Sequence, residues 1–155
     1  MASQALEMRA RYMVLLLLAE GPKTGYELIK RIRSALGEVG AAASPGTVYP
    51  VLRSLEEEGF IEASEEPHGA RQRKVYRITR RGLEQLLRMV NRGLHVIEAA
   101  IRLHIDAARG LARVEPGGEL RPLLEETVER LERIEELTES LIEALRGILA
   151  AVPTA

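Results

Sequence analysis

Two stretches of this 155-residue chain hold the residues best suited to binding a polyanion. The first, SPGTVYPVLRSLEEEGFI at 44–61, has hydroxyls and one arginine in its first half and three consecutive glutamates at 56–58. The second, RQRKVYRITRR at 71–81, contains six cations and no acidic residue. Hydroxyl, guanidinium and ammonium groups all donate hydrogen bonds to phosphate oxygens, so both stretches are candidates for contact with a phosphate backbone.

The first stretch has the pattern of a helix with one buried face. Its apolar residues Val48, Leu52 and Leu55 fall at i, i+4 and i+7, one stripe of an α-helix. The opposite face begins with hydroxyls and a cation and ends in the glutamates, so only its N-terminal half suits a phosphate backbone. This polarity is typical of a recognition helix that enters a DNA groove with its N-terminus first.

Two prolines complicate the beginning of this helix. Ser44 and Pro45 fit an N-cap and a first helical position. Pro50 lacks the amide that would bond back to residue 46. We therefore expect the regular helix to begin near Thr47, after a lead-in over 44–46, and to end at Gly59.

The second stretch is predicted to be part of a β-hairpin. Residues 60–65 and 72–79 alternate in character and should pair, with Pro67, His68 and Gly69 near the tip. The cations of this hairpin suit a phosphate clamp, the wing of a winged helix. The alternative is an edge strand that uses Lys and Arg only to prevent aggregation.

The residues before 44 predict the other helices that a winged helix-turn-helix domain needs. The segment 6–19 is apolar on nearly all sides and predicts a central buried helix, which Gly21 and Pro22 end. Thr24 and Glu27 have capping-box spacing, and a helix carrying apolar residues at 28, 29, 32 and 36 should follow. Residues 37–43, rich in Gly and Ala, predict the turn before the recognition helix.

The C-terminal half predicts two long helices, at about 79–110 and 119–151. Apolar residues recur every seven positions in two series from 120 and 124, which indicates a coiled-coil-like seam. A helix of this length in a small chain usually packs against a partner, here a second copy. The residues expected to form the dimerisation seam are Leu120, Leu124, Leu131, Ile134, Leu141, Leu145 and Ile148. We predict two domains: a DNA-binding domain at 1–82 and a dimerisation region at 83–155.

Composition argues against several other classes of protein. There is no Cys, and the three His are scattered, so neither a thiolate metal site nor a metal cluster is expected. His95 and His104 lie on opposite sides of one predicted helix, and no group of residues suggests catalysis or a cofactor. No apolar run approaches the length of about 20 residues that spans a bilayer, so we expect a cytoplasmic protein. Residues 1–82 carry 13 cations against 10 carboxylates, and the remainder carry 9 against 13.

Three blocks of the sequence resemble the PadR family of transcriptional regulators. They are GPKTGYELIKRI at 21–32, SPGTVYPVLRSLEEEGFI at 44–61 and RKVYRITRRG at 73–82. The resemblance implies a mainly α fold with a small β-hairpin wing, a winged helix-turn-helix domain followed by long C-terminal dimerisation helices. It also implies a homodimeric repressor that binds a pseudo-palindromic operator on double-stranded DNA and is released by a small-molecule effector.

Carried over to this chain, the family's DNA-facing positions fall in all three blocks. They are Lys23, Thr24, Tyr26, Ser44, Thr47, Tyr49, Pro50, Arg53, Arg71, Arg73 and Lys74. Arg53 is the best candidate for contact with a base edge. The chain has no Trp, so the capture of flat aromatic ligands between tryptophans, known in some relatives, is excluded. An effector pocket would be aliphatic and would include Tyr12, Met89 or His104.

A second hypothesis is a protein-interaction module that reuses the winged-helix scaffold and works through its coiled-coil helices. The glutamates at 56–58 and the small positive charge of residues 1–82 are compatible with it. The two hypotheses differ in whether a continuous basic surface joins Arg53 to the wing.

Overall fold

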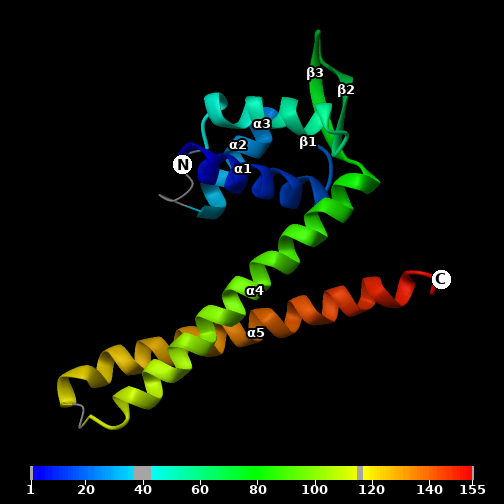
Figure 1. The fold of residues 1–155 in the computed structure, drawn as a ribbon. Helices are drawn as coiled ribbons and strands as arrows, with labels where there is room; N and C mark the ends of the chain where they lie inside the picture. Colours follow the sequence, from blue (N-terminus) through cyan, green and yellow to red (C-terminus); the bar gives the residue numbers. More distant parts are fainter. Residues whose placement is uncertain (1, 37–42, 115–116, 155) are drawn as a thin grey trace. The chain divides into compact units, whose positions relative to one another are not determined.

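The computed structural model describes residues 2–36, 43–114 and 117–154. It is mainly α-helical with one small antiparallel sheet, as the sequence predicted (Figure 1). The elements are α1 (Ala2–Ala19), β1 (Lys23–Thr24), α2 (Gly25–Leu36), α3 (Pro45–Glu57), β2 (Ile61–His68), β3 (Arg71–Ile78), α4 (Arg80–Leu111), a short 3-10 helix (Gly118–Leu120) and α5 (Arg121–Ala151). The chain forms two compact units, 1–99 and 100–155, and each is described by itself.

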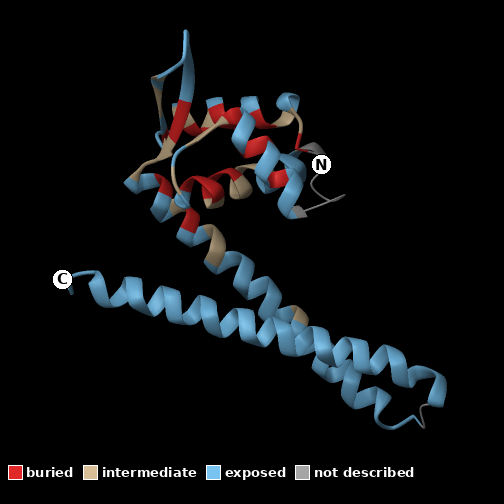
Figure 2. Ribbon diagram, turned by 180° about the vertical axis from the view of Figure 1, so that it is seen from behind, coloured by how far each residue is buried: buried red, intermediate tan, exposed pale blue. Residues whose placement is uncertain are grey.

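The core of the first unit lies between α1, α2 and α3. The segment of α1 predicted to be central supplies Val14, Leu15, Leu17 and Leu18, all buried. The predicted stripe of α3 is confirmed, since Val48, Leu52 and Leu55 have no solvent exposure. Leu28 and Ile32 of α2 complete the centre. Figure 2 shows this buried layer on the facing sides of the three helices. Aliphatic contacts with α1 and α2 therefore fix the position of α3 in the first unit.

The sheet has the strand order β1-β3-β2, with all pairs antiparallel. The hairpin prediction is confirmed, but the first strand continues three residues beyond its predicted end, since Pro67 pairs with Gln72 and His68 with Arg71. The turn is Gly69–Ala70, with Gly69 at φ +61°, a left-handed conformation that suits glycine. Strand β1 was not predicted. It pairs Lys23 with Tyr76 and Thr24 with Val75 and joins the wing to the start of α2.

Helix α4 begins against the base of the sheet. Thr79 caps it, since the Thr79 hydroxyl accepts a hydrogen bond from the Gly82 amide at 3.1 Å and donates one to the Gly59 carbonyl at 2.7 Å. Leu86 is buried in the core, and Met89 and Val90 pack against it. The core of the first unit thus includes the first three turns of this long helix.

The second unit contains the end of α4 and all of α5. No described residue of α5 is buried (Figure 2). Within the described part of the chain, no helix has an apolar stretch sufficient to cross a membrane. No group of His, Asp and Glu among those residues is arranged to hold a metal ion.

The turn predicted over 37–43 falls almost entirely outside the described residues. Only Ala43 is described, and it is buried. The Arg33 side chain donates to the Ala43 carbonyl at 2.8 Å, which links the end of α2 to the residue before the N-cap of α3.

Candidate nucleic-acid interface

Helix α3 presents one face to the core and one to solvent. Val48, Val51, Leu52 and Leu55 are buried. The exposed face of its N-terminal half carries Pro45, Gly46, Tyr49, Pro50 and Arg53. The glutamates at 56–58 stand at the C-terminal end. The polarity predicted from the sequence is therefore present in three dimensions, with the hydroxyls and the arginine on accessible surface.

The late start predicted for this helix is wrong. It begins at Pro45 with Ser44 as N-cap, and the Ser44 carbonyl accepts from the amides of Thr47 at 3.0 Å and Val48 at 2.9 Å. Pro50 lies inside the helix. Its missing amide leaves the Gly46 carbonyl without a helical donor, and Gly46 is exposed, so water can satisfy that oxygen. The proline is tolerated because it faces solvent.

Ser44 does not cap the helix with its side chain. Its hydroxyl lies 3.1 Å from the Thr47 hydroxyl, and no side-chain cap bond forms. Both hydroxyls stand beside the first turn of α3, where the amides of Thr47 and Val48 already donate to the Ser44 carbonyl. The two hydroxyls are therefore the groups in this turn that suit an incoming phosphate oxygen.

Three residues at the start of α2 were predicted to contact DNA, and the structure places them in different environments. The Lys23 ammonium folds back and donates to the carbonyls of Leu17 at 2.8 Å and Gly21 at 3.3 Å, so it satisfies the end of α1. Thr24 forms the predicted capping box, because its amide donates to the Glu27 carboxylate at 2.7 Å and its hydroxyl accepts from the Glu27 amide at 3.2 Å. Tyr26 is 71% exposed and is available to a ligand.

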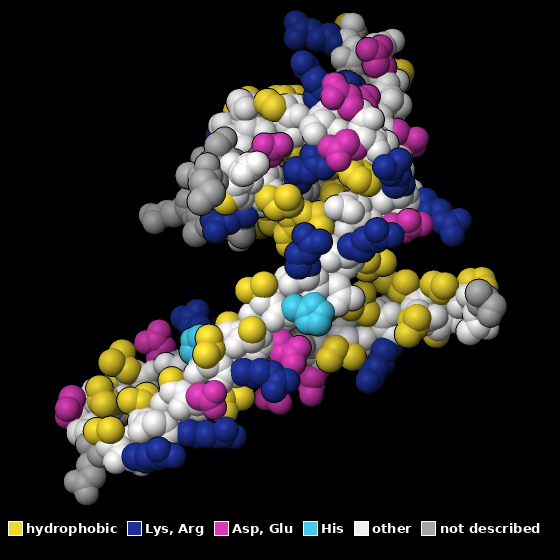
Figure 3. Space-filling view, in the orientation of Figure 1, with side chains coloured by type: hydrophobic (Ala, Val, Ile, Leu, Met, Phe, Trp, Pro, Cys, Tyr) yellow, Lys and Arg dark blue, Asp and Glu magenta, His cyan; other side chains and the backbone are white. Residues whose placement is uncertain are grey.

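The wing carries the other predicted contacts on β3. Arg71, Arg73 and Lys74 are all exposed. Two of them meet carboxylates of the helices: Arg73 lies 4.0 Å from Glu27 of α2, and Lys74 lies 2.9 Å from Glu56 of α3. Figure 3 shows Lys and Arg side chains along the wing with Asp and Glu side chains beside them. Positive and negative groups therefore alternate where the wing meets the helices.

The charged groups shift one another in the expected directions. The hydrogen bond to Glu56 raises the pKa of Lys74 above its ordinary value. Bonds from the Thr24 amide and hydroxyl lower the pKa of Glu27. Tyr76 of β3 is buried, and this burial raises the pKa of its hydroxyl. Each of these groups therefore has its ordinary charge at neutral pH.

An unpredicted arginine fixes the far end of the recognition helix. Arg11 of α1 donates to the Ser54 hydroxyl at 2.8 Å and to the Glu58 carboxylate at 2.8 Å, and its side chain is only 14% exposed. Ser54 also donates to Glu58 at 2.8 Å. The Arg11 hydrogen bond lowers the pKa of Glu58. The partners are 43 and 47 residues apart, so no local pattern in the sequence signals this contact.

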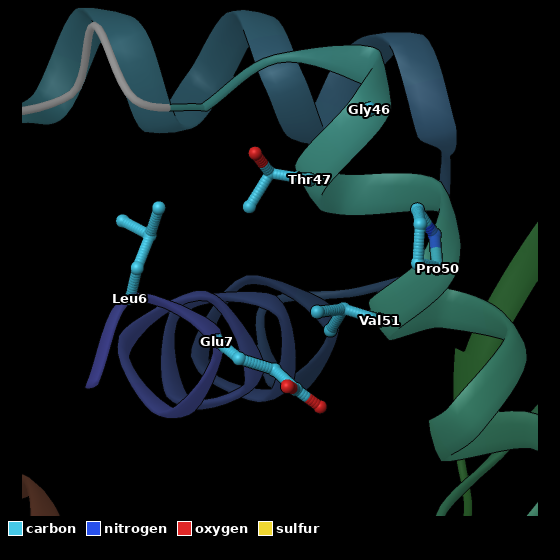
Figure 4. A pocket seen from close by; sticks show the side chains of 6 residues that line it. All are labelled: Leu6, Glu7, Gly46, Thr47, Pro50 and Val51. Atoms are coloured by element: carbon cyan, nitrogen blue, oxygen red, sulfur yellow. The ribbon is translucent and has the colours of Figure 1, made fainter. Parts of the chain in front are cut away.

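A small hollow lies beside the N-terminal half of α3 (Figure 4). It has a volume of about 270 Å³. Its lining comes from α1 and α3: Leu6, Glu7, Gly46, Thr47, Pro50 and Val51. The side chains of Leu6 and Thr47 point into the gap between the helices. A ligand in this hollow would lie next to residues predicted to contact DNA.

The structure leaves the predicted dimerisation residues uncovered. All seven are exposed and lie on α5 or immediately before it: Leu120, Leu124, Leu131, Ile134, Leu141, Leu145 and Ile148. Of the predicted effector residues, Tyr12 and Met89 pack partly buried against the core. His104 is exposed in the second unit, with Nδ1 2.6 Å from the Ala100 carbonyl. None of the three lines the hollow described above. The effector pocket stays a prediction.

A family model and two known transcriptional regulators match part of this chain. A model of the transcriptional regulator PadR-like family matches residues 14–88, from the buried part of α1 into α4. Transcriptional activator GvpE2 of Halobacterium salinarum is 38% identical over 66 residues, which cover 43% of this chain and 31% of that protein. Transcriptional regulator Rv3488 of Mycobacterium tuberculosis is 38% identical over 65 residues, which cover 36% of this chain and 61% of that protein. The chain thus spans less than two thirds of either relative.

Solved structures of transcriptional regulators have a similar fold. A PadR-like transcriptional regulator from Bacillus cereus is 28% identical with a TM-score of 0.56, covering 64% of this chain and 95% of that one. A transcriptional regulator from Clostridium thermocellum is 26% identical with a TM-score of 0.54, covering 61% and 94%. The matched residues include the recognition helix, the wing and the capping box described above. The winged helix at residues 14–88 of this chain belongs to the PadR-like family of transcriptional regulators.

Proposed function

We propose that the chain is a homodimeric repressor that reads a pseudo-palindromic operator on double-stranded DNA. One observation carries this proposal: the polar N-terminal half of α3 and the basic strand of the wing are both exposed on the first unit. A recognition helix supplies base contacts, and a wing supplies phosphate contacts. In this proposal residues 1–82 bind DNA and residues 83–155 hold two copies together.

In this proposal, the chemistry of each side chain determines whether it contacts a base or a phosphate. Arg53 is exposed on α3, and its fork of donors matches O6 and N7 of guanine. Ser44 and Thr47 are suited to phosphate oxygens near the helix N-terminus, and Arg71 to those beside the wing. Tyr26 extends this surface at the start of α2. Lys23, whose ammonium is occupied by carbonyls, is proposed to hold α1 and α2 rather than to contact DNA.

Dimerisation through α5 is supported by its uncovered apolar side chains. This 31-residue helix has leucines and isoleucines repeating every seven positions, and none of them is buried within the chain. A surface of this kind is favourable only when a partner covers it. A second copy supplies the matching repeat, as in a coiled coil. Two copies would place their recognition helices at half-sites about 34 Å apart, one turn of DNA.

Repression is the proposed sign of regulation because occupying a promoter is sufficient to block it. The related GvpE2 is named an activator, so transcript measurement must decide. Deleting the gene should raise transcription from the promoter that the protein binds, and restoring the gene should lower it again. A fall in transcription on deletion would instead make the chain an activator.

Fluorescence anisotropy tests operator binding directly. The wild-type protein is titrated with a labelled duplex from upstream of its own gene and with a scrambled duplex of equal length, over a series of salt concentrations. We expect tighter binding to the upstream duplex, and affinity for both that falls steeply with salt. Equal affinity for the two duplexes at every salt concentration would contradict the operator proposal for this promoter.

A further inference from the structure

The wing cation Lys74 is bound to a carboxylate of the recognition helix. Its ammonium donates to the Glu56 carboxylate at 2.9 Å, between residues 18 positions apart. The ring of Tyr76, two residues further along the same strand, lies 5.3 Å from this ammonium. The buried ring and the carboxylate together hold Lys74 toward the C-terminal half of α3.

The cations of the wing therefore differ in how available they are to DNA. Arg71 has no ion pair with any of the described residues. Arg73 lies at the longer distance of 4.0 Å from its carboxylate partner, Glu27. The ion pair of Lys74 is the shorter of the two, at 2.9 Å. The positive charge of Lys74 is already balanced by the Glu56 carboxylate of α3.

This ion pair is accessible enough to be exchanged. The Lys74 side chain is 51% exposed and the Glu56 side chain 36%. A DNA phosphate that binds Lys74 must replace Glu56, and the released carboxylate then attracts a cation from solution. That uptake offsets the cation that the neutralised phosphate releases. Binding through Lys74 in the wild type should thus contribute little to the salt dependence of affinity.

We propose that Glu56 sets the DNA affinity of this interface by competing with phosphate for Lys74. The inference rests on the proposed DNA-binding function. Phosphate contacts carry no sequence information, so weakening one of them lowers affinity for all DNA. Contacts of α3 to bases are not weakened. Glu56 therefore increases the fraction of the total binding free energy that depends on sequence.

The test compares two glutamates on the same helix. Glu57 follows Glu56, is exposed and has no ion pair among the described residues, so Glu57→Gln makes the same change in net charge. The four variants are Glu56→Gln, Glu57→Gln, Lys74→Gln and the double variant Glu56→Gln with Lys74→Gln. Each is titrated by anisotropy with a fluorescein-labelled 30-base-pair duplex of random sequence, over a series of salt concentrations, after circular dichroism has confirmed its fold.

Glu56→Gln should tighten binding by about two- to fivefold, the range set by the strength of an exposed ion pair. The slope of log affinity against log salt should become steeper by about 0.9, one additional phosphate contact. Glu57→Gln should tighten binding by less than about twofold with an unchanged slope, because screening weakens a charge without a direct contact. The gain from Glu56→Gln should disappear in the double variant.

Three outcomes overturn the inference. Two of them are equal tightening by Glu56→Gln and Glu57→Gln, and a gain that persists without Lys74; either outcome leaves wild-type DNA binding, and so the proposed function, intact. If neither the wild type nor any variant binds the duplex even at the lowest salt concentration, the inference and the proposed function both fail. Tight binding by Glu56→Gln alone would support the inference strongly.

Discussion

The ring of Tyr49 lies directly against Gly25. A Cβ built at position 25 would stand 2.6 Å from Cε1 and 2.9 Å from the hydroxyl oxygen of Tyr49. Gly25 is the first residue of α2, and Tyr49 lies on the exposed side of α3, where it is 47% exposed. The absence of a side chain at Gly25 thus lets the recognition helix rest on the start of its neighbour.

Gly25→Ala should weaken DNA binding more than it weakens folding. The added methyl group conflicts with a half-exposed ring, which can swing away, so we expect a loss of less than about 1 kcal/mol in the free energy of unfolding. The displaced ring would move within the surface predicted to face DNA. Urea unfolding and anisotropy titration measure the two effects. Tyr49→Ala should remove the conflict, so Gly25→Ala should cost no stability in that background.

Gly82 and Gly93 of α4 should respond oppositely to alanine. A Cβ at Gly82 would lie 2.0 Å from the Phe60 carbonyl oxygen, a backbone atom that cannot turn aside, whereas nothing lies within 4 Å at Gly93. We expect Gly82→Ala to destabilise the fold by about 1–3 kcal/mol. Gly93→Ala should stabilise it by about 0.5–1 kcal/mol, the helix preference for alanine. Chemical unfolding of both variants checks this, and equal effects would refute the predicted contact at Gly82.

Local signals in the sequence were sufficient for much of the fold. The buried stripe of α3 follows from spacings of three and four residues, and the Thr24–Glu27 capping box from a spacing of three. The wing follows from alternation and from a turn at Gly69. Each of these patterns lies within a few residues of chain, where backbone geometry alone decides which side chains meet.

The features that the sequence did not predict depend on contacts or exposure in the folded chain. Strand β1 has only two residues, too few to show alternation, and it exists because β3 lies beside it. The start of α3 was misplaced because exposure, which the sequence does not give, decides whether Pro50 is tolerated. The contacts of Arg11 with Glu58 and of Lys74 with Glu56 join residues far apart in the chain. Their carboxylates belong to the run 56–58, which looked like a uniform acidic end.

Arg53 and Arg71 should affect DNA binding in distinguishable ways. Arg53→Ala is expected to cost about 1–3 kcal/mol on the preferred duplex, with a smaller loss on a scrambled one, because a bidentate base contact is lost. Arg71→Ala should weaken binding to both duplexes alike and reduce the salt slope by about one. Anisotropy titrations on the two duplexes measure this. If Arg53→Ala weakens both duplexes equally, Arg53 contacts phosphate and not bases.

The α5 seam gives a prediction about assembly. Leu131 lies on the seam and is 55% exposed, whereas Leu137 lies outside both heptad series and is 66% exposed. Leu131→Glu should shift the protein from dimer to monomer at micromolar concentration, because it would place a charge in an apolar interface. Leu137→Glu should have a much smaller effect. Sedimentation equilibrium measures both, and a wild-type monomer would contradict dimerisation through α5.

The Arg11–Glu58 pair should make stability depend on pH. The Arg11 hydrogen bond holds the pKa of Glu58 below its ordinary value of 4.5 in the folded protein, and in the unfolded chain that bond is absent. A carboxyl group whose pKa is depressed by folding stabilises the protein fully above the unfolded pKa, and that stabilisation is lost as the pH falls through the folded pKa. Glu58→Gln should therefore lower the free energy of unfolding at pH 7, and the difference from wild type should shrink as the pH falls below the unfolded pKa of 4.5. Glu57→Gln provides the control, since no described partner binds Glu57, and its difference from wild type should stay small and nearly constant. Urea unfolding at a series of pH values measures both, and a Glu58→Gln difference that does not change with pH would mean that Arg11 does not stabilise the ionised carboxylate.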